Sequence, residues 1–180
     1  MPEGGGAGRP VLGEAELRQL VGAAANPLVL VLDCVQDPHN LGAILRTAEA
    51  AGVDAVVAPK DKSAGLTETV RRVSVGAADR VPFVQVTNLV RALEALKQEG
   101  LWLVGTTDHA AQCLYQLDLT GPLALVMGSE EKGMRRLTEE HCDFRAAIPM
   151  AGGVGCLNVS VATGVCLFEA VRQRQAPRLP

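Results

Sequence analysis

A glycine-rich loop that leads into an amphipathic helix is the part of the sequence best suited to hold a ligand. The segment 152–174 reads GGVGCLNVSVATGVCLFEAVRQR. Gly152, Gly153 and Gly155 allow the backbone to adopt positive φ angles and to approach a bound molecule closely. Asn158 is placed to cap the helix that follows, because its side-chain oxygen can accept from free N–H groups of the first turn. We therefore predict a ligand-binding loop at this position.

The helix after this loop carries apolar side chains at helical spacing. Val161, Val165 and Phe168 recur in the pattern of one helix face. Arg172 and Arg174 lie near the end of the helix, where the helix dipole favours cations. The pattern is typical of an amphipathic helix that closes an α/β domain.

Two further clusters carry side chains that could do chemistry. In DPHNLGAILRTA, residues 37–48, Asn40 stands at the start of a helix and Arg46 points away from its apolar stripe. In VMGSEEKGMRR, residues 126–136, a buried strand ends at Gly128 and is followed by Glu130. Taken alone, each cluster has an ordinary interpretation as a helix cap, a solubilising arginine or an acidic loop. Together they fall where strand ends meet loops, the position at which open α/β sheets bind ligands.

Several common sites are excluded by their motifs. The glycines of GSEEKGM have P-loop spacing, but Met134 follows Gly133 where that motif needs Lys and Ser or Thr. No G-x-G-x-x-G follows the first strand, and no G-x-S-x-G is present. The histidines His39, His109 and His141 are scattered, and the five cysteines show no C-x-x-C spacing. We therefore expect no metal site and no disulfide framework.

Composition indicates one soluble domain. The 180 residues are 48% hydrophobic and only 3% aromatic, which favours a core of Val, Leu, Ala and Ile. No apolar run approaches a membrane span, so we expect a cytoplasmic protein without membrane contact. With 17 basic and 20 acidic residues the net charge is −3, so any contact with RNA must be local. The arginines that we select for phosphate contact are Arg46, Arg71, Arg72, Arg135 and Arg136.

The order of elements predicts an α/β fold. Apolar runs alternate with helical patterns, and this order implies a mostly parallel sheet with helices on both faces. The first ten residues are rich in Gly and Pro and are predicted to be a linker, before a short helix around Leu17 to Val21. The predicted strands are 28–32, 53–57, 81–86, 101–104, 123–127 and 144–148. The predicted helices are 41–51, 67–77, 89–99, 137–141 and the terminal one, with Gly52 and Gly100 after helix ends and Asn88 as a cap.

Three ordered segments resemble the signature motifs of the SpoU family of RNA ribose methyltransferases, within the SPOUT superfamily. They are DPHNLGAILRTA, MGSEEKGM and IPMAGGVGCLNVSVATG. Two segments are especially similar to the bacterial 23S ribosomal RNA guanosine-2′-O-methyltransferase branch: IPMAGGVGCLNVSVATGVCLFEAVRQR and VTNLVRALEALKQEGLWLVGT. The resemblance covers about Pro27 to Arg174. It divides the chain into a linker with a short helix (1–26), a methyltransferase catalytic domain (27–174) and a tail (175–180).

The resemblance implies a six-stranded sheet whose C-terminal segment forms a deep trefoil knot. It also implies a homodimer, 23S ribosomal RNA as the substrate and S-adenosylmethionine as the cofactor. Gly128, Ile148 and Leu157 would contact the cofactor, with Thr106 from a neighbouring loop. Ile148 and Leu157 have apolar side chains that suit the two faces of an adenine.

The resemblance also assigns catalytic roles. The reaction would be attack of a ribose 2′ oxygen on the sulfonium methyl, served by Arg46 from the opposite subunit. A guanidinium is always protonated, so orienting the substrate is an easier role for it than accepting a proton. Asn40, Glu130, Asn158 and Ser160 would position Arg46, the loops and the ribose through hydrogen bonds.

Two departures leave alternatives open. The third motif commonly reads Ser-Leu-Asn, but this chain has Cys156 in place of the serine, and a thiol is a weaker hydrogen-bond partner. About 26 residues precede the first predicted strand, too few for the separate RNA-binding domain that often occurs in this branch. A transfer RNA ribose methyltransferase, or a non-catalytic RNA-binding or assembly module with the same fold, are the alternative functions.

Overall fold

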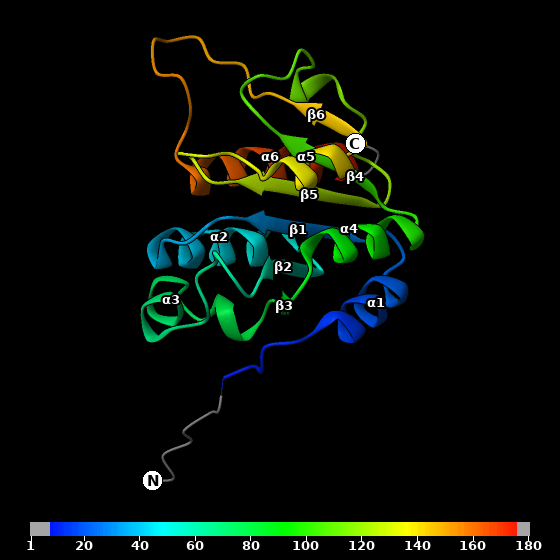
Figure 1. Cartoon of the computed structure of the whole chain (residues 1–180), viewed down its shortest axis with the longest axis vertical. Helices are drawn as coiled ribbons and strands as arrows, with labels where there is room; N and C mark the ends of the chain where they lie inside the picture. Colours follow the sequence, from blue (N-terminus) through cyan, green and yellow to red (C-terminus); the bar gives the residue numbers. More distant parts are fainter. Residues whose placement is uncertain (1–7, 176–180) are drawn as a thin grey trace, which may run out of the picture.

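The protein is built on one sheet of six parallel strands in the order β3-β2-β1-β5-β4-β6 (Figure 1). The structure is a computed structural model and describes residues 8–175. Parallel neighbours need a crossover connection, and the helices between the strands supply it. The predicted α/β class with a parallel sheet is confirmed. The strands are β1 (Leu28–Asp33), β2 (Ala55–Pro59), β3 (Phe83–Val86), β4 (Trp102–Thr106), β5 (Leu123–Gly128) and β6 (Phe144–Ala146).

Helices cover both faces of the sheet (Figure 1). Strand β1 shows why its sequence is apolar throughout: Leu28, Leu30 and Leu32 belong to one core, and Val29 and Val31 belong to the other. The first core includes α2, α3 and α6, and the second includes α1 and α4. A strand buried on both faces reads as a continuous apolar run. The helices are α1 (Glu14–Ala23), α2 (Pro38–Ala51), α3 (Glu68–Val73), α4 (Leu89–Gln98), α5 (Arg136–His141) and α6 (Val159–Gln175).

The helix ends follow the predicted capping residues in most cases. Gly52 and Gly100 have φ angles of 75° and 88°, the left-handed conformation that glycine adopts at helix ends. Asn88 caps α4 by accepting from the Arg91 backbone N–H. The predicted helix 67–77 is wrong in its second half, because α3 ends at Val73 and Val75 has a φ of 53°. A positive φ interrupts the helical path, and a separate 3₁₀ turn follows at Ala77–Asp79.

The first described residues join the fold. Residues 1–7 of the predicted linker lie outside the described part of the chain. Arg9 donates from Nη1 to the carbonyl oxygen of Arg80 at 2.7 Å. Leu12 exchanges backbone hydrogen bonds with Phe83 and Gln85 and extends the sheet beyond β3. The division of the chain into domains stays a prediction.

Helix α6 buries a different face from the one that its pattern suggested. Val161 and Phe168 are 52% and 45% exposed. The buried side chains instead include Val159, Cys166 and Ala170, which pack on the core that contains α2. Apolar residues therefore line two sides of α6, and within residues 8–175 the side of Val161 and Phe168 is the more exposed one.

The end of α6 is tied to loops at the start of the sheet. Arg174 donates to the carbonyl oxygens of Asn26, Pro27, Leu119 and Gly121, at 2.6 to 3.2 Å. These bonds join α6 to the segments that lead into β1 and β5.

The tail 176–180 lies outside the described residues, and the trefoil knot stays a prediction. Within residues 8–175, no helix is long and apolar enough to cross a membrane.

Candidate active site

The three sequence clusters meet at one hydrogen-bonded centre. The Asn158 side chain donates from Nδ2 to Asn40 Oδ1 at 3.1 Å and to Glu130 Oε1 at 2.8 Å. These partners are 118 and 28 positions away from Asn158 in the sequence. Asn40 comes from the start of α2, Glu130 from the loop after β5 and Asn158 from the residue before α6. One side chain thus joins all three motifs.

The same centre caps helix α6. Asn158 Oδ1 accepts from the backbone N–H of Ser160 at 2.9 Å and from the Ser160 hydroxyl. Glu130 Oε1 accepts from the backbone N–H of Val159 at 2.9 Å. Carboxylates and side-chain oxygens are favourable at this end of a helix, where N–H groups lack intrahelical partners. Asn40, Glu130, Asn158 and Ser160 therefore lie together, and their catalytic roles stay predictions.

A cavity of about 300 Å³ lies beside this centre, at the carboxyl ends of β4, β5 and β6. Its wall includes the four residues selected from the sequence for cofactor contact, Thr106, Gly128, Ile148 and Leu157. The volume is at the lower end of the usual range for small-molecule sites. The apolar part of the wall also includes Met127, Met134, Ala146, Val159 and Ala162.

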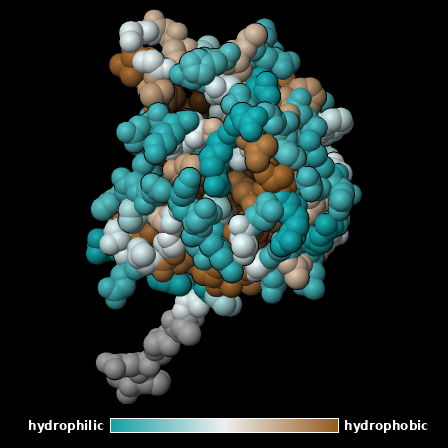
Figure 2. All heavy atoms as spheres, viewed as in Figure 1, coloured by the Kyte–Doolittle hydropathy of each residue, from teal (hydrophilic) through white to brown (hydrophobic). Residues whose placement is uncertain are grey.

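The cavity also has an acidic wall, of which the sequence analysis identified only Glu130. Asp108, Glu130, Glu131 and Glu139 line it, against a single lysine, Lys132. Asp108, Glu130 and Glu131 follow β4 or β5 closely, and Glu139 lies on α5. Loops at the carboxyl ends of parallel strands share one edge of the sheet, so these positions could have indicated the acidic wall from the sequence. Figure 2 shows apolar side chains in hollows between hydrophilic ones on one face of the molecule. An acidic wall favours a cationic ligand.

Gly128 is required by the protein chain itself. A Cβ atom at Gly128 would overlap the carbonyl carbon of Gly133 and the amide nitrogen of Met134. The loop folds back here because the Gly133 N–H donates to the Ser129 carbonyl at 2.8 Å and Gly133 has a φ of 67°. The group that approaches Gly128 closely in this structure is therefore the following loop.

The glycines of the third motif are less constrained than expected. Gly152, Gly153 and Gly155 are not among the residues with positive φ, and an added Cβ at any of them would meet open space. Gly155 and Cys156 line the cavity, and Cys156 is exposed. The cysteine that replaces the usual serine therefore stands in the wall of the proposed cofactor site.

Arg46 lies outside the cavity of its own chain. It is exposed on α2, is absent from the cavity wall, and has no hydrogen-bond or ion-pair partner within residues 8–175. Asn40 and Arg46 are six positions apart, so they project from α2 on different sides. The structure of a single chain does not bring Arg46 to the Asn158 centre.

Of the other arginines selected for phosphate contact, Arg135 is held by a buried carboxylate. Its guanidinium donates from Nε to Oδ1 of Asp33, whose side chain is fully buried, at 2.9 Å, and Nη2 lies 2.9 Å from the same oxygen. This hydrogen bond holds the pKa of Arg135 above its ordinary value. Arg71 is paired with Asp79 at 2.6 Å, whereas Arg136 has an 82% exposed side chain. Asp33 was missed, although an acid at the end of an apolar strand is a visible signal.

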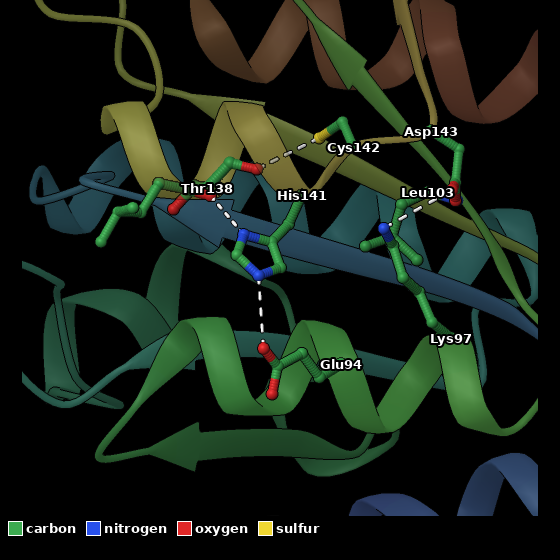
Figure 3. A network of polar contacts seen from close by, with 8 residues as sticks. Glu94, Lys97, Leu103, Thr138, His141, Cys142 and Asp143 are labelled. Carbon is green, nitrogen blue, oxygen red and sulfur yellow. Dashed lines mark hydrogen bonds and ion pairs between the residues drawn. The ribbon is translucent and has the colours of Figure 1, made fainter.

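A second polar network holds α5 against α4 and β4 (Figure 3). His141 Nδ1 contacts the Leu137 carbonyl oxygen at 2.7 Å, and Nε2 contacts Glu94 Oε1 at 3.3 Å. Asp143 accepts from the Leu103 backbone N–H at 2.8 Å and lies 3.5 Å from Lys97 Nζ. These contacts fix the helix that carries Glu139, one of the acidic residues of the cavity wall.

Two of the thiols near this region are shielded. Burial raises the pKa of Cys142 and of Cys166 to about 12. Both therefore act as small apolar side chains at neutral pH. Within residues 8–175, no group of three or more His, Cys, Asp or Glu side chains is arranged to hold a metal ion.

The fold and the site together define the class of protein: a parallel α/β sheet has a cavity at the carboxyl ends of its strands, and three motifs joined by hydrogen bonds meet beside it. The model of the SpoU rRNA Methylase family matches residues 27–168, and the chain belongs to this family. Similar proteins include the 23S rRNA (guanosine-2′-O-)-methyltransferase RlmB of Pseudomonas putida. It is 64% identical over 169 residues, which cover 93% of this chain and 68% of the relative. The Escherichia coli RlmB is 58% identical over 161 residues, covering 89% of this chain and 66% of the relative.

Solved structures share the fold. The SpoU methyltransferase AviRb from Streptomyces viridochromogenes, in complex with the cofactor AdoMet, is 30% identical with a TM-score of 0.80. The match covers 88% of this chain and 64% of AviRb. The Aquifex aeolicus TrmH/SpoU tRNA modifying enzyme is 32% identical with a TM-score of 0.78, covering 92% and 84% of the two chains. The chain thus spans about two thirds of the length of its curated relatives and somewhat less of AviRb.

Proposed function

We propose that this chain is the methyltransferase part of an enzyme that uses S-adenosylmethionine to methylate the ribose 2′-hydroxyl of a guanosine in 23S ribosomal RNA. The observation that carries the proposal is the meeting of the three SpoU motifs at one cavity, in a chain 64% identical to the P. putida RlmB. The identity to the A. aeolicus tRNA modifying enzyme is half as high, which favours ribosomal over transfer RNA. An enzyme with this substrate works in the cytoplasm.

The residues of the cavity fit the proposed cofactor. Ile148 and Leu157 offer apolar side chains for an adenine, and the acids of the wall suit the positive charges of a sulfonium and an ammonium group. S-adenosylmethionine, when bound, supplies an activated methyl group.

The Asn158 centre would position the substrate ribose. Glu130 uses Oε1 for Asn158 and Val159, and its Oε2 makes no hydrogen bond within residues 8–175. This second oxygen is available to accept a hydrogen bond from the ribose. Asn40 and Asn158 hold each other by their amides, so both stay oriented before the substrate arrives.

Arg46 would complete the site from a second copy of the chain. Its exposure on α2, outside its own cavity, is consistent with service to a neighbouring subunit. Its guanidinium would orient the 2′ oxygen and the adjacent phosphate, because it stays protonated. The uncovered apolar side chains Val161 and Phe168 on α6 give a homodimer a surface to bury.

The knot is also part of the proposal. The chain leaves β6 at one edge of the sheet, runs through an irregular segment and returns as α6 beside α2 and β5 (Figure 1). This return path supports the threading that the SpoU resemblance implies. The bonds from Arg174 to the loops before β1 and β5 would hold the threaded segment in place.

Methyl transfer with defined RNAs tests the proposal. Calorimetry with S-adenosylmethionine should give saturable binding, and labelled methyl should appear on a guanosine of 23S rRNA. Arg46→Ala should abolish transfer while cofactor binding persists, and Arg18→Ala, which removes an exposed arginine of α1, should leave both unchanged. Methylation of transfer RNA instead would favour the first alternative. Binding of cofactor and RNA without transfer would favour the non-catalytic module, a result compatible with Cys156 in the third motif.

A further inference from the structure

The carboxylate of Asp33 is the most completely buried charged group that the proposed chemistry does not use. Asp33 ends β1 and its side chain is 0% exposed. Its Oδ2 accepts from the Arg135 backbone N–H at 2.9 Å, and its Oδ1 accepts from the Arg135 guanidinium at 2.9 Å. The Cys34 thiol also donates to Oδ1 at 3.6 Å. Most donors to this buried carboxylate thus belong to one residue, Arg135, which lies 102 positions along the sequence.

Residue 33 holds both ends of the loop that walls the cavity. In the register of β1 and β5, Asp33 is the partner of Gly128, the residue at which the loop leaves the sheet. Its carboxylate binds Arg135, the residue at which the loop ends and α5 begins. Residues 128–134, between these two points, all line the cavity. Both ends of the loop 128–135 therefore contact Asp33.

Apart from the pair of Asp33 and Arg135, the loop 128–135 is tied to the rest of the chain by the hydrogen bonds of Glu130 Oε1 to Asn158 and Val159. Ser129 is half-buried, and Glu130, Glu131 and Lys132 are exposed, whereas Met134 is 8% exposed and is the buried apolar anchor. Loops with few buried apolar contacts open at low free-energy cost. A charge-assisted contact to a fully buried carboxylate resists such opening more than a surface pair does.

We propose that Asp33 and Arg135 are positioning residues that keep the loop 128–135 closed in the form that binds the cofactor and presents Glu130 to Asn158. This inference rests on the proposed function for the identity of the ligand. The Arg135 guanidinium brings two nitrogens, Nε and Nη2, close to Asp33 Oδ1. A lysine has a single ammonium nitrogen and cannot reproduce both contacts. Loss of the pair should free the loop and weaken cofactor binding without dismantling the sheet.

A paired apolar replacement separates positioning from stability. Removing one partner leaves a buried charge unpaired and destabilises strongly, whereas replacing both with apolar residues is often neutral. Asp33→Leu combined with Arg135→Met leaves no unpaired charge but removes the acceptor of the residue-135 backbone N–H, so its unfolding temperature should fall less than that of Asp33→Leu alone. Calorimetry should nevertheless show S-adenosylmethionine affinity at least about tenfold weaker. Hydrogen exchange of the amides in 129–135 should be faster than in the wild type, with or without cofactor.

Two further variants complete the test. Glu14→Leu with Arg91→Met removes a surface ion pair of α1 and α4, 3.0 Å between charged atoms, and should change neither affinity nor loop exchange. Arg135→Lys keeps the charge, so the chain should fold, with cofactor affinity between those of the wild type and the double variant. Wild-type affinity and wild-type loop exchange in the paired Asp33 and Arg135 variant would overturn the inference. Failure of the wild-type protein to bind S-adenosylmethionine would instead refute the proposed function. In that case, hydrogen exchange of the loop amides would still test whether Asp33 and Arg135 hold the loop closed.

Discussion

Replacing Gly128 with alanine should damage the cofactor site more than the fold. The added Cβ would lie 2.7 Å from the Gly133 carbonyl oxygen and closer still to neighbouring backbone atoms. An ordinary contact is about 3.5 Å, so the loop would have to move by about 1 Å. Backbone cannot rotate away as a side-chain tip can, and overpacking of this kind costs about 1 to 3 kcal/mol. In a chain of this size, each kcal/mol lowers Tm by about 2 to 4 °C.

Calorimetric titration with S-adenosylmethionine, beside a thermal melt, measures both effects. We expect Gly128→Ala to lower cofactor affinity by at least about tenfold, because the moved loop forms the wall of the cavity. Gly42→Ala is a control for stability alone. Its Cβ would lie 2.7 Å from the Val73 Cβ between α2 and α3, away from the cavity, and the helix propensity of alanine offsets the cost by about 1 kcal/mol. Gly155→Ala is a control within the cavity wall, where a Cβ meets open space.

The comparison of the three variants can refute the reasoning. If Gly128→Ala binds S-adenosylmethionine as tightly as Gly155→Ala does, the loop 128–135 either accommodates the methyl group or does not shape the site. If Gly42→Ala loses as much affinity as Gly128→Ala, the loss reflects general destabilisation. Either result would remove the link between the tight turn at Gly128 and cofactor binding.

Four other predictions rest on individual contacts. Asn158→Ala removes the cap of α6 and the link to Glu130 and should cost about 1 kcal/mol in a denaturant titration, a typical loss for a cap. Cys156 should react with a thiol reagent at about pH 8 before any shielded thiol and be protected by S-adenosylmethionine, as mass spectrometry of digests would show. Burial in the folded state raises the pKa of Cys142 and of Cys166 from 9.0 to about 12. The stability that the two thiols contribute is therefore present below pH 9.0 and is lost as the pH rises toward 12. Thermal melts across this pH range would detect the loss. Arg174→Met should destabilise the chain by roughly 2 to 4 kcal/mol in the same denaturant assay, because four carbonyl groups lose a charged donor, and an unchanged midpoint would contradict this.

The class of fold was visible in the sequence because burial on both faces demands apolar residues at every position of a strand. The run Leu28–Asp33 shows this directly, since alternate side chains enter two different cores. Gly52, Gly100 and Asn88 marked helix ends correctly because their preferences are local. The helix predicted over 67–77 failed at Val75, whose positive φ is uncommon for a β-branched residue and interrupts the helical path.

The sequence by itself determined which chemical groups the protein has and on which strand-to-loop junctions they stand. It placed Asn40, Glu130 and Asn158 after or before regular elements, and local rules sufficed for that. Only the tertiary structure decided that Asn158 bonds to both of the others, and that Arg46, equally prominent in its motif, stays outside the cavity of its own chain. Parallel strands bring their carboxyl ends to one edge, but which side chains touch there depends on the register of the sheet and on how the loops fold back. Asp33 and Arg135, 102 positions apart, are partners for that reason alone.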